Sequence, residues 1–425
     1  MQEIKKINLS LEWKYEKLGK LCSFDKEGVN PKEDIKYYHY SFPAFDNNKE
    51  PEVEVGKDIK SSKFLFNKGD ILFNKLNVKF KRVWDIDFDI DENSICSTEF
   101  IPIQAKNIDR NFLYYCLISP NFTNEMKYLS TGTSNSHQRI NPKDIKDYDL
   151  FLPTDEEIQK KIGYILKLLD KKISMNVEIN KNLEELMHVL FKKYFIDNNP
   201  FYVENDEKWN IIKLKDLIIR NRDKINDFDN WKDELLIDLS NMPRFSIAIS
   251  NFDKGKKFTS NIYKLNKYDL LFGSIRPYFG KVGFSPINGV VTGTVHSFKP
   301  IDDIYYSLVL SLISSKTFIN YTVSVSKGTK MPSVKWDDFI NYEFAIPDDL
   351  SKIGEYNKIL LPLIHKIEKN ILEIQRLTKL RDTLLPKLMS GEIDVSKINC
   401  DLELRYNYMK YLFNQIHTPM SKSVV

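Results

Sequence analysis

The sequence predicts an α+β protein in which two pseudo-symmetric mixed domains are separated by two long helices that form an antiparallel coiled coil. Three observations predict this fold: a long internal repeat, strand-rich runs inside each repeat, and an amphipathic stripe that closes each repeat. We place a first mixed module at 1–153, a first helix at 154–199, a second mixed module at 200–347, a second helix at 348–391 and a C-terminal extension at 392–425.

The repeat consists of four short motifs that return 194 to 199 residues later. The matched segments are 13–18 with 209–214, 70–73 with 269–272, 132–133 with 328–329, and 151–153 with 345–347. Solenoid repeats span roughly 20–50 residues, so this period is too long for a solenoid. It indicates a duplicated domain instead, and two similar modules suit a two-part target such as DNA.

Each module opens with short runs of β-branched and aromatic residues that are broken by turn signals. In the first module we expect strands at 63–66, 70–73, 82–84 and 99–103, and one helix near 110–129. In the second module we expect strands at 269–273, 280–284 and 294–299, and one helix near 304–321.

A long amphipathic stripe follows Pro153, and a second one follows Pro347. Shifting the second stripe by 194 residues lands on the first at nine of ten apolar positions, and only Ile374 meets a polar residue, Asn180. We therefore expect the two helices to pack on each other, although each stripe could instead dock on its own module. Pro362 should kink or restart the second helix. The predicted seam residues are Ile162, Leu169, Ile173, Leu183, Leu190, Leu363, Ile367, Ile374, Leu377 and Leu384.

After the second helix, Ser390-Gly391 is a candidate C-cap. A short amphipathic segment at 402–416 is expected to pack back near the N-terminus.

The composition excludes several classes of protein. Apolar residues make up 42% of the 425-residue chain, which favours folded modules over disorder. No apolar run approaches the ~20 residues of a membrane span, and the N-terminus lacks the apolar core of a signal peptide. The four cysteines are scattered, so neither a disulfide framework nor a zinc ribbon is indicated. We expect a cytoplasmic protein.

Positive charge is concentrated in the same segment of both repeats. The net charge is only +4, but residues 57–82 hold eight basic and two acidic residues, and residues 254–281 hold seven and one. A lysine-rich solvated surface would explain any single lysine. Concentration in both repeats favours a stripe that faces phosphates.

Signatures of catalysis are missing. There is no phosphate loop, no glycine-rich turn with the spacing needed for a methyl-donor cofactor, and no histidine pair at ligand spacing. The closest approach to an adenine-methylating loop, 198–201, lacks the second proline and lies on a linker. We expect no cofactor, no metal and no catalytic residue in this chain.

Two segments in each repeat are candidates for contacts with DNA. The first follows the strand at 70–73 or 269–272, and positions that differ between the copies would read different bases. The second is a polar loop before the closing strand, which a solvent-exposed glycine turn would also explain. The candidate DNA-binding residues are Lys75, Asn77, Lys79, Lys81, Arg82, Thr133, Ser134, Asn135, Gln138, Arg139, Arg276, Tyr278, Lys281, Thr329 and Lys330.

The end of the second helix carries the most specific motif of the chain. Residues 377–393 read LTKLRDTLLPKLMSGEI, and with the two-module order they resemble the DNA-specificity subunit of type I restriction-modification enzymes. The resemblance covers essentially the whole chain. It implies that two target recognition domains read a bipartite sequence in double-stranded DNA and that the helices set the gap. It also implies two methylation subunits as partners, with restriction subunits able to join.

Two alternatives from other classes remain open. A coiled-coil adaptor would bind protein rather than DNA, and would lack salt-dependent, sequence-selective duplex binding. A stand-alone enzyme would transfer methyl groups as a purified chain.

Overall fold

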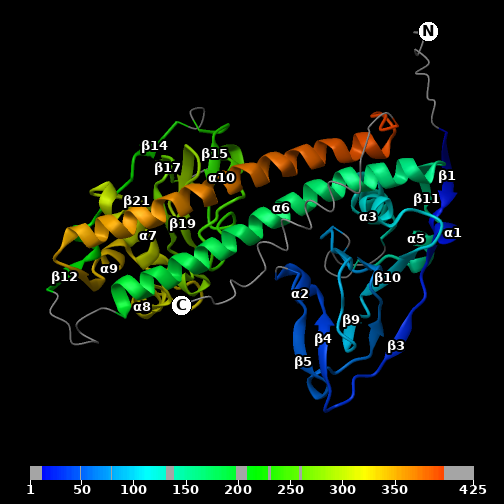
Figure 1. Ribbon diagram of the computed structural model, residues 1–425, viewed down its shortest axis with the longest axis horizontal. Coiled ribbons are helices and arrows are strands. Elements are labelled where there is room, and N and C mark those ends of the chain that lie inside the picture. The colour runs from blue at the N-terminus through cyan, green and yellow to red at the C-terminus, as the bar shows by residue number, and fades with distance from the viewer. Residues whose placement is uncertain are drawn as a thin grey trace, which may run out of the picture. The chain divides into compact units, whose positions relative to one another are not determined.

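The computed structural model describes residues 12–47, 49–77, 79–130, 138–197, 208–227, 231–257 and 261–396. These residues pack into two compact units. Unit 1 is formed by the described residues within 1–169 and 380–425, and unit 2 by those within 170–379. Figure 1 shows the helices and strands of both units.

Unit 1 carries three β-sheets in its described part. Its strands are β1 (Trp13–Lys17), β2 (Cys22–Ser23), β3 (Glu27–Val29), β4 (Lys36–Tyr40), β5 (Glu52–Val55), β6 (Lys63–Leu65), β7 (Ile71–Asn74), β8 (Val83–Asp85), β9 (Ser94–Ser97), β10 (Phe100–Ala105) and β11 (Asp149–Pro153). The sheets have the orders β1-β11, β2-β10-β7-β8 and β3-β6-β9-β4-β5. β1 and β11 are antiparallel with Trp13 opposite Pro153, so the first and last strands of the module meet.

Unit 2 repeats this topology strand for strand. Its strands are β12 (Trp209–Lys213), β13 (Ile218–Arg220), β14 (Lys224–Ile225), β15 (Leu235–Ile237), β16 (Asp253–Lys254), β17 (Ile262–Leu265), β18 (Leu270–Gly273), β19 (Val282–Phe284), β20 (Gly289–Thr292), β21 (Val295–Pro300) and β22 (Glu343–Pro347). The orders are β12-β22, β13-β21-β18-β19 and β14-β17-β20-β15-β16, with Trp209 opposite Pro347. The predicted duplication is confirmed.

Two helices pack where the sequence predicts one, and this is so in both units. The module helices are α1 (Leu18–Leu21), α2 (Phe42–Asp46), α3 (Arg110–Ile118), α4 (Pro120–Leu129), α5 (Pro142–Lys146), α7 (Tyr306–Ser314), α8 (Lys316–Val325) and α9 (Trp336–Ile340). The single helices expected near 110–129 and 304–321 are wrong because a serine ends one helix and caps the next. The Ser119 hydroxyl accepts from the Phe122 N–H, and the Ser315 hydroxyl accepts from the Phe318 N–H.

The two long helices are α6 (Glu156–Phe191) and α10 (Leu350–Met389), and their segments pack against each other within each unit. In unit 1, Ile158 and Ile162 of α6 share a core with Leu388 of α10. In unit 2, Phe191 at the other end of α6 shares a core with Tyr356 of α10. The structure thus confirms the predicted helix pair.

The middle of the pair, within unit 2, is polar. The buried Asn370 donates a hydrogen bond through Nδ2 to Oδ1 of Asn180 (2.8 Å), and Asn176 Nδ2 donates to Oε2 of Glu373 (3.0 Å). Asn176 and Asn370 are equivalent positions of the repeat, separated by 194 residues, and neither has any exposed surface. A buried polar pair favours one register of a coiled coil over its neighbours.

All ten predicted seam residues are at least half-buried. Ile162, Ile367 and Ile374 are buried, and Leu169, Ile173, Leu183, Leu190, Leu363, Leu377 and Leu384 are half-buried. Other apolar positions of the two stripes are open to solvent, since Val177, Leu186, Ile359 and Leu380 are 43–53% exposed. Leu360 and Ile364 are buried. The buried face of α10 is therefore rotated by about one residue from the predicted stripe at these positions.

Of the two outcomes expected at Pro362, a kink or a restart, the restart does not occur, because α10 is one helix of 40 residues. Pro362 is exposed, while Leu360 and Ile364 on either side of it are fully buried. Tertiary packing on both sides of the proline therefore outweighs the one lost hydrogen bond.

The end of α10 returns to the start of the chain within unit 1. Gly391 has φ of 74°, as a C-cap glycine requires, and the Trp13 ring lies 2.9 Å from where its Cβ would be. Val395 is buried in the core of unit 1, and Lys161 Nζ donates to Ser396 O (2.9 Å). The amphipathic segment expected at 402–416 lies outside the described residues.

Within the described ranges, no single helix has the length and apolar character of a membrane span. Cys22, Cys96 and Cys116 are free, buried thiols, and burial raises the pKa of Cys22 to about 12.

Candidate nucleic-acid interface

In each unit, the loop after the central buried strand passes through a left-handed backbone residue. Asn77 follows β7 with φ of 54°, and Arg276 follows β18 with φ of 51°. The two residues occupy the same position of the repeat. Asparagine tolerates this conformation, whereas arginine adopts it rarely, and such outliers concentrate at functional sites. The shared scaffold therefore presents different side chains from one backbone geometry.

Hydrogen bonds tie this loop to the second predicted segment in the same way in both units. The two segments that the sequence suggested separately thus form one surface in each unit. In unit 1 the bonds are Asn77 N to Gln138 O (2.8 Å), Ile140 N to Lys75 O (2.9 Å) and Phe80 N to Asn77 O (3.0 Å). In unit 2 they are Arg276 N to Pro332 O (2.7 Å), Val334 N to Ser274 O (2.9 Å) and Phe279 N to Arg276 O (3.0 Å).

The predicted residues of unit 2 lie mostly at the surface. Tyr278 is 44% exposed, Thr329 and Lys330 are exposed, and Arg276 is half-buried. The Nε of Arg276 is buried without a hydrogen-bond partner among the described residues. Lys281 is different, because its ammonium donates to the Leu239 carbonyl and burial lowers its pKa.

The predicted residues of unit 1 include two arginines that carboxylates already neutralise. Arg82 makes a two-point ion pair with Asp46, with its Nε 2.8 Å and its Nη2 2.6 Å from the carboxylate oxygens. Arg139 pairs with Glu99 at 2.7 Å. Arg82 therefore lies where it stabilises the fold. Of the other candidates, Lys79 and Lys81 are exposed, and Lys75, Asn77 and Gln138 are half-buried. Thr133, Ser134 and Asn135 lie outside the described residues.

Sequence reasoning missed three arginines of unit 2. Arg220 and Arg222 lie at and just past the end of β13, and Arg244 lies with its guanidinium carbon 3.9 Å from the Phe279 ring centroid. The signal was available in the composition, because the chain has only 10 arginines among 63 basic residues. Four of the 10 arginines, Arg276 and these three, fall in this one module.

The helix α6 helps to fix the loop of unit 2 that carries Arg276. The buried carboxylate of Glu184 accepts from the Ser246 hydroxyl (2.8 Å) and from the Ile247 N–H (3.2 Å). The neighbouring Phe245 N–H donates to Gly280 O (3.0 Å), which ties this contact to the loop that carries Arg276. Burial raises the pKa of Glu184 to about 7.

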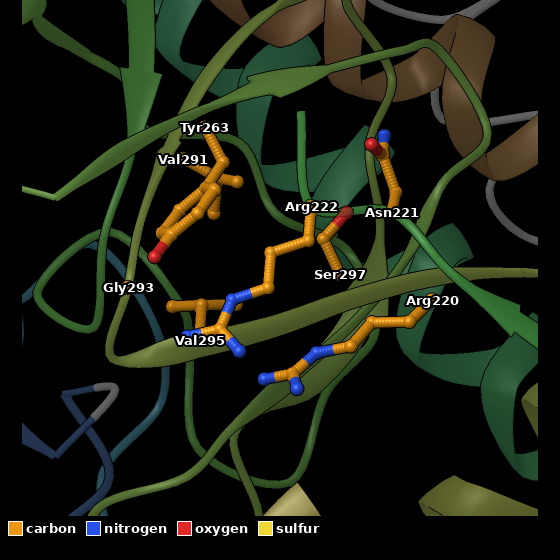
Figure 2. Close-up of a pocket in the computed structure, with 8 residues that line it drawn as sticks. All are labelled: Arg220, Asn221, Arg222, Tyr263, Val291, Gly293, Val295 and Ser297. Atoms are coloured by element: carbon orange, nitrogen blue, oxygen red, sulfur yellow. The ribbon is translucent and has the colours of Figure 1, made fainter. Parts of the chain in front are cut away.

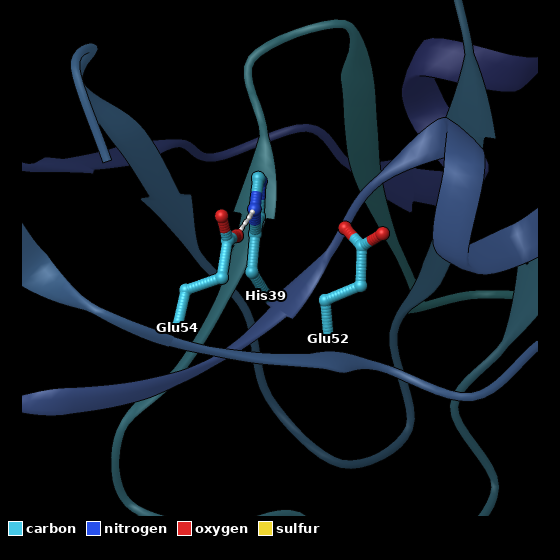
Figure 3. A group of neighbouring side chains, drawn as sticks. All are labelled: His39, Glu52 and Glu54. Carbon is cyan, nitrogen blue, oxygen red and sulfur yellow. Dashed lines mark hydrogen bonds and ion pairs between the residues drawn. The ribbon is translucent and has the colours of Figure 1, made fainter. Parts of the chain in front are cut away.

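A histidine–carboxylate cluster lies on β4 and β5 of unit 1 (Figure 3). His39 Nδ1 lies 2.5 Å from Oε2 of Glu54, and Glu52 accepts from the Ser41 hydroxyl at 2.8 Å. His39 and Glu52 are directly opposite on the strand ladder. An ordinary cross-strand ion pair accounts for this arrangement.

The two modules have equivalent sheet topology, and each is followed by a long helix. Residues 10–185 match the family model described as the type I restriction modification DNA specificity domain. The chain is 26% identical over 322 residues to the type I restriction enzyme MjaIX specificity subunit of Methanocaldococcus jannaschii, covering 70% of this chain and 72% of that protein. It is 34% identical over 159 residues to the HindI specificity subunit of Haemophilus influenzae, covering 36% of this chain and 34% of that one.

The fold has a counterpart among solved structures. The crystal structure of the type I restriction-modification S subunit from M. genitalium superposes with a TM-score of 0.59 at 16% identity, covering 91% of this chain and 99% of that chain. The chain is thus similar in sequence to specificity subunits of type I restriction enzymes, and residues 10–185 carry the match to the specificity-domain model.

Proposed function

We propose that the chain reads a bipartite sequence in double-stranded DNA, with one module for each half, and that it has no catalytic activity of its own. The observation that carries the proposal is the pair Asn77 and Arg276. One hydrogen-bonded loop geometry occurs in both units and presents an amide in one and a guanidinium in the other. Asparagine suits an adenine edge and arginine a guanine edge, so two unlike half-sites are expected.

In this proposal the modules are 1–153 and 200–347, and the helices at 154–199 and 348–391 set the gap between the half-sites. Support comes from the continuity of α6 and α10, which contain 36 and 40 residues and would each span about 55–60 Å. One turn of B-DNA measures roughly 34 Å. The Asn180–Asn370 hydrogen bond supports a single register, and a fixed register is what a spacer of constant length requires.

The methylation and restriction activities would reside in partner subunits. Leu186 of α6 and Leu380 of α10 are equivalent positions of the repeat, and they are 44% and 45% exposed. Two matched apolar surface positions suit two copies of the same partner, as the family's pair of methylation subunits requires.

The test is a binding measurement with the full chain assembled with the methylation subunits of its own system. Mapping of methylated adenines in cells with and without the chain first identifies the motif. Duplexes are then altered in one half-site at a time. Each alteration should weaken binding, and affinity should fall steeply with salt. Equal affinity for the motif and for scrambled duplexes would contradict sequence reading.

A further inference from the structure

Arg220 and Arg222 line a hollow of unit 2 together with Tyr263 and Ser297 (Figure 2). The guanidinium carbon of Arg220 lies 4.5 Å from the Trp336 ring centroid, and that of Arg222 lies 5.6 Å from the ring of Tyr263. The stick view shows the two guanidinium groups extending toward the same side of the hollow. Aromatic rings hold both cations while leaving their hydrogen-bond donors available.

The two guanidinium groups of the hollow have few acidic neighbours in the described part of the chain. Among the described residues, no ion pair involves Arg220 or Arg222, and Asp337 is the acidic group that acts on Arg220 from the neighbouring helix α9. Burial and then the charge of Arg222 lower the pKa of Arg220. Two cations that repel each other without a counter-ion are stabilised by an anion that binds both.

The wall of the hollow contains a further unused donor. Ser297 is 3% exposed, and its hydroxyl has no hydrogen-bond partner within the part of the chain that the structure describes. A buried hydroxyl without a partner carries an energetic penalty that a bound acceptor removes.

The hollow adjoins the loop that carries Arg276. Gly293 and Val295 of its lining flank Thr294, whose carbonyl accepts from both the N–H (3.0 Å) and the hydroxyl (2.7 Å) of Ser274. Ser274 begins the loop that leads to Arg276, so a duplex on that loop would have its backbone near the hollow.

The equivalent strand end of unit 1 has a different set of side chains, with Lys146 Nζ 5.4 Å from the Phe24 ring centroid. The pairing of β2 with β10 and of β13 with β21 aligns Phe24, Asp25 and Lys26 with Arg220, Asn221 and Arg222. The formal charge of the three residues is zero in unit 1 and +2 in unit 2. Lys26 keeps the stacking position, 5.5 Å from the Phe64 ring.

We propose that Arg220, Arg222 and Ser297 bind a backbone phosphate of the DNA beside the half-site that unit 2 reads, whereas the equivalent residues 24–26 of unit 1 offer no guanidinium group. This inference rests on the proposed function. Guanidinium groups match phosphate oxygens in pairs, and phosphate contacts fix the position of a protein on DNA without reading its sequence.

The experiment measures how affinity depends on salt, using the full-length chain assembled with its methylation subunits. The probes are a duplex with the mapped motif and a scrambled duplex of equal length. The variants are Arg222→Gln, Arg220→Gln/Arg222→Gln and Arg220→Lys/Arg222→Lys, with Lys358→Gln on the exposed face of α10 as a matched loss of charge elsewhere. Arg222 is exposed, so its single variant should leave the fold intact, which thermal melting checks.

The double glutamine variant should weaken binding to both duplexes by the same factor and should reduce the slope of log affinity against log salt by about 1. The lysine variant should keep the slope, and Lys358→Gln should change neither quantity. An unchanged slope and affinity in the double variant would overturn the phosphate site, and a loss confined to the motif would assign these arginines to base reading instead. Salt-independent binding by the wild type would refute the proposed function itself.

Discussion

The two units share a backbone scaffold but treat positive charge differently. In unit 1, Asp46 and Glu99 neutralise Arg82 and Arg139. In unit 2, no ion pair is found for Arg220, Arg222, Arg244 or Arg276 among the described residues, and the first three lie over aromatic rings. The two units therefore share the loops that carry Asn77 and Arg276 and the hydrogen bonds of these loops, but the charged side chains around them differ. Guanidinium groups serve the fold in unit 1 and remain available to an anion in unit 2.

The largest expected effect comes from exchanging the left-handed residues of the two loops. Arg276→Asn places in unit 2 the residue that unit 1 uses at φ near 54°, so the backbone should be kept while the guanidinium is lost. Discrimination at the second half-site should fall by about 1–3 kcal/mol if Arg276 contacts a guanine edge. Binding to duplexes altered in one half-site measures this. An equal loss on every sequence would make Arg276 a phosphate contact.

The next effect concerns the polar contacts that α6 makes with each module, which differ in chemistry between the units. In unit 1, Lys167 and Arg110 hold Asp85 by ion pairs at 2.5 Å, whereas in unit 2 neutral donors hold Glu184. Because burial raises the pKa of Glu184 to about 7, its folded form binds a proton more tightly than the unfolded chain does. Its stabilising contribution is complete below the unfolded pKa and is lost as pH rises through 7.

Glu184→Gln should therefore gain melting temperature relative to the wild type as pH rises from about 5 to 8, with a difference in unfolding free energy on the order of 2 kcal/mol. Thermal unfolding at several pH values measures it. A constant difference between the two proteins across that range would show that Glu184 does not titrate as a buried acid.

The smallest expected effect comes from Arg82, which we expect to support the fold and not to contact DNA. The Arg82–Asp46 pair is half open to solvent on the Asp46 side, so Arg82→Gln should cost about 1 kcal/mol of stability. The salt dependence of DNA binding should stay as it is in the wild type, in contrast with Arg222→Gln. A drop in the salt slope without a change in melting temperature would place Arg82 on the DNA instead.

The sequence was enough to predict the duplicated topology and the pairing of the long helices, because both follow from periodic patterns that repeat at one offset. It could not predict the break at Ser119 or the unbroken helix through Pro362, since each depends on whether a local hydrogen bond or tertiary packing contributes more. Composition indicated a basic segment in unit 1 but not that Asp46, 36 residues away, would neutralise Arg82. Nor could spacing alone reveal that the segment around Gln138 hydrogen-bonds to Asn77. Contacts between distant residues decide these points.

In the proposed function, the helix pair sets the distance between two half-sites. Seven residues inserted after Leu169 in α6 and seven before Leu380 in α10 would add one heptad to each helix and keep both stripes in phase. The added length is about 10 Å, or roughly three base pairs. Mapping methylated adenines in cells that carry this variant should show both half-sites unchanged and the gap longer by about three base pairs. Methylation of the original motif with its original gap would contradict the account.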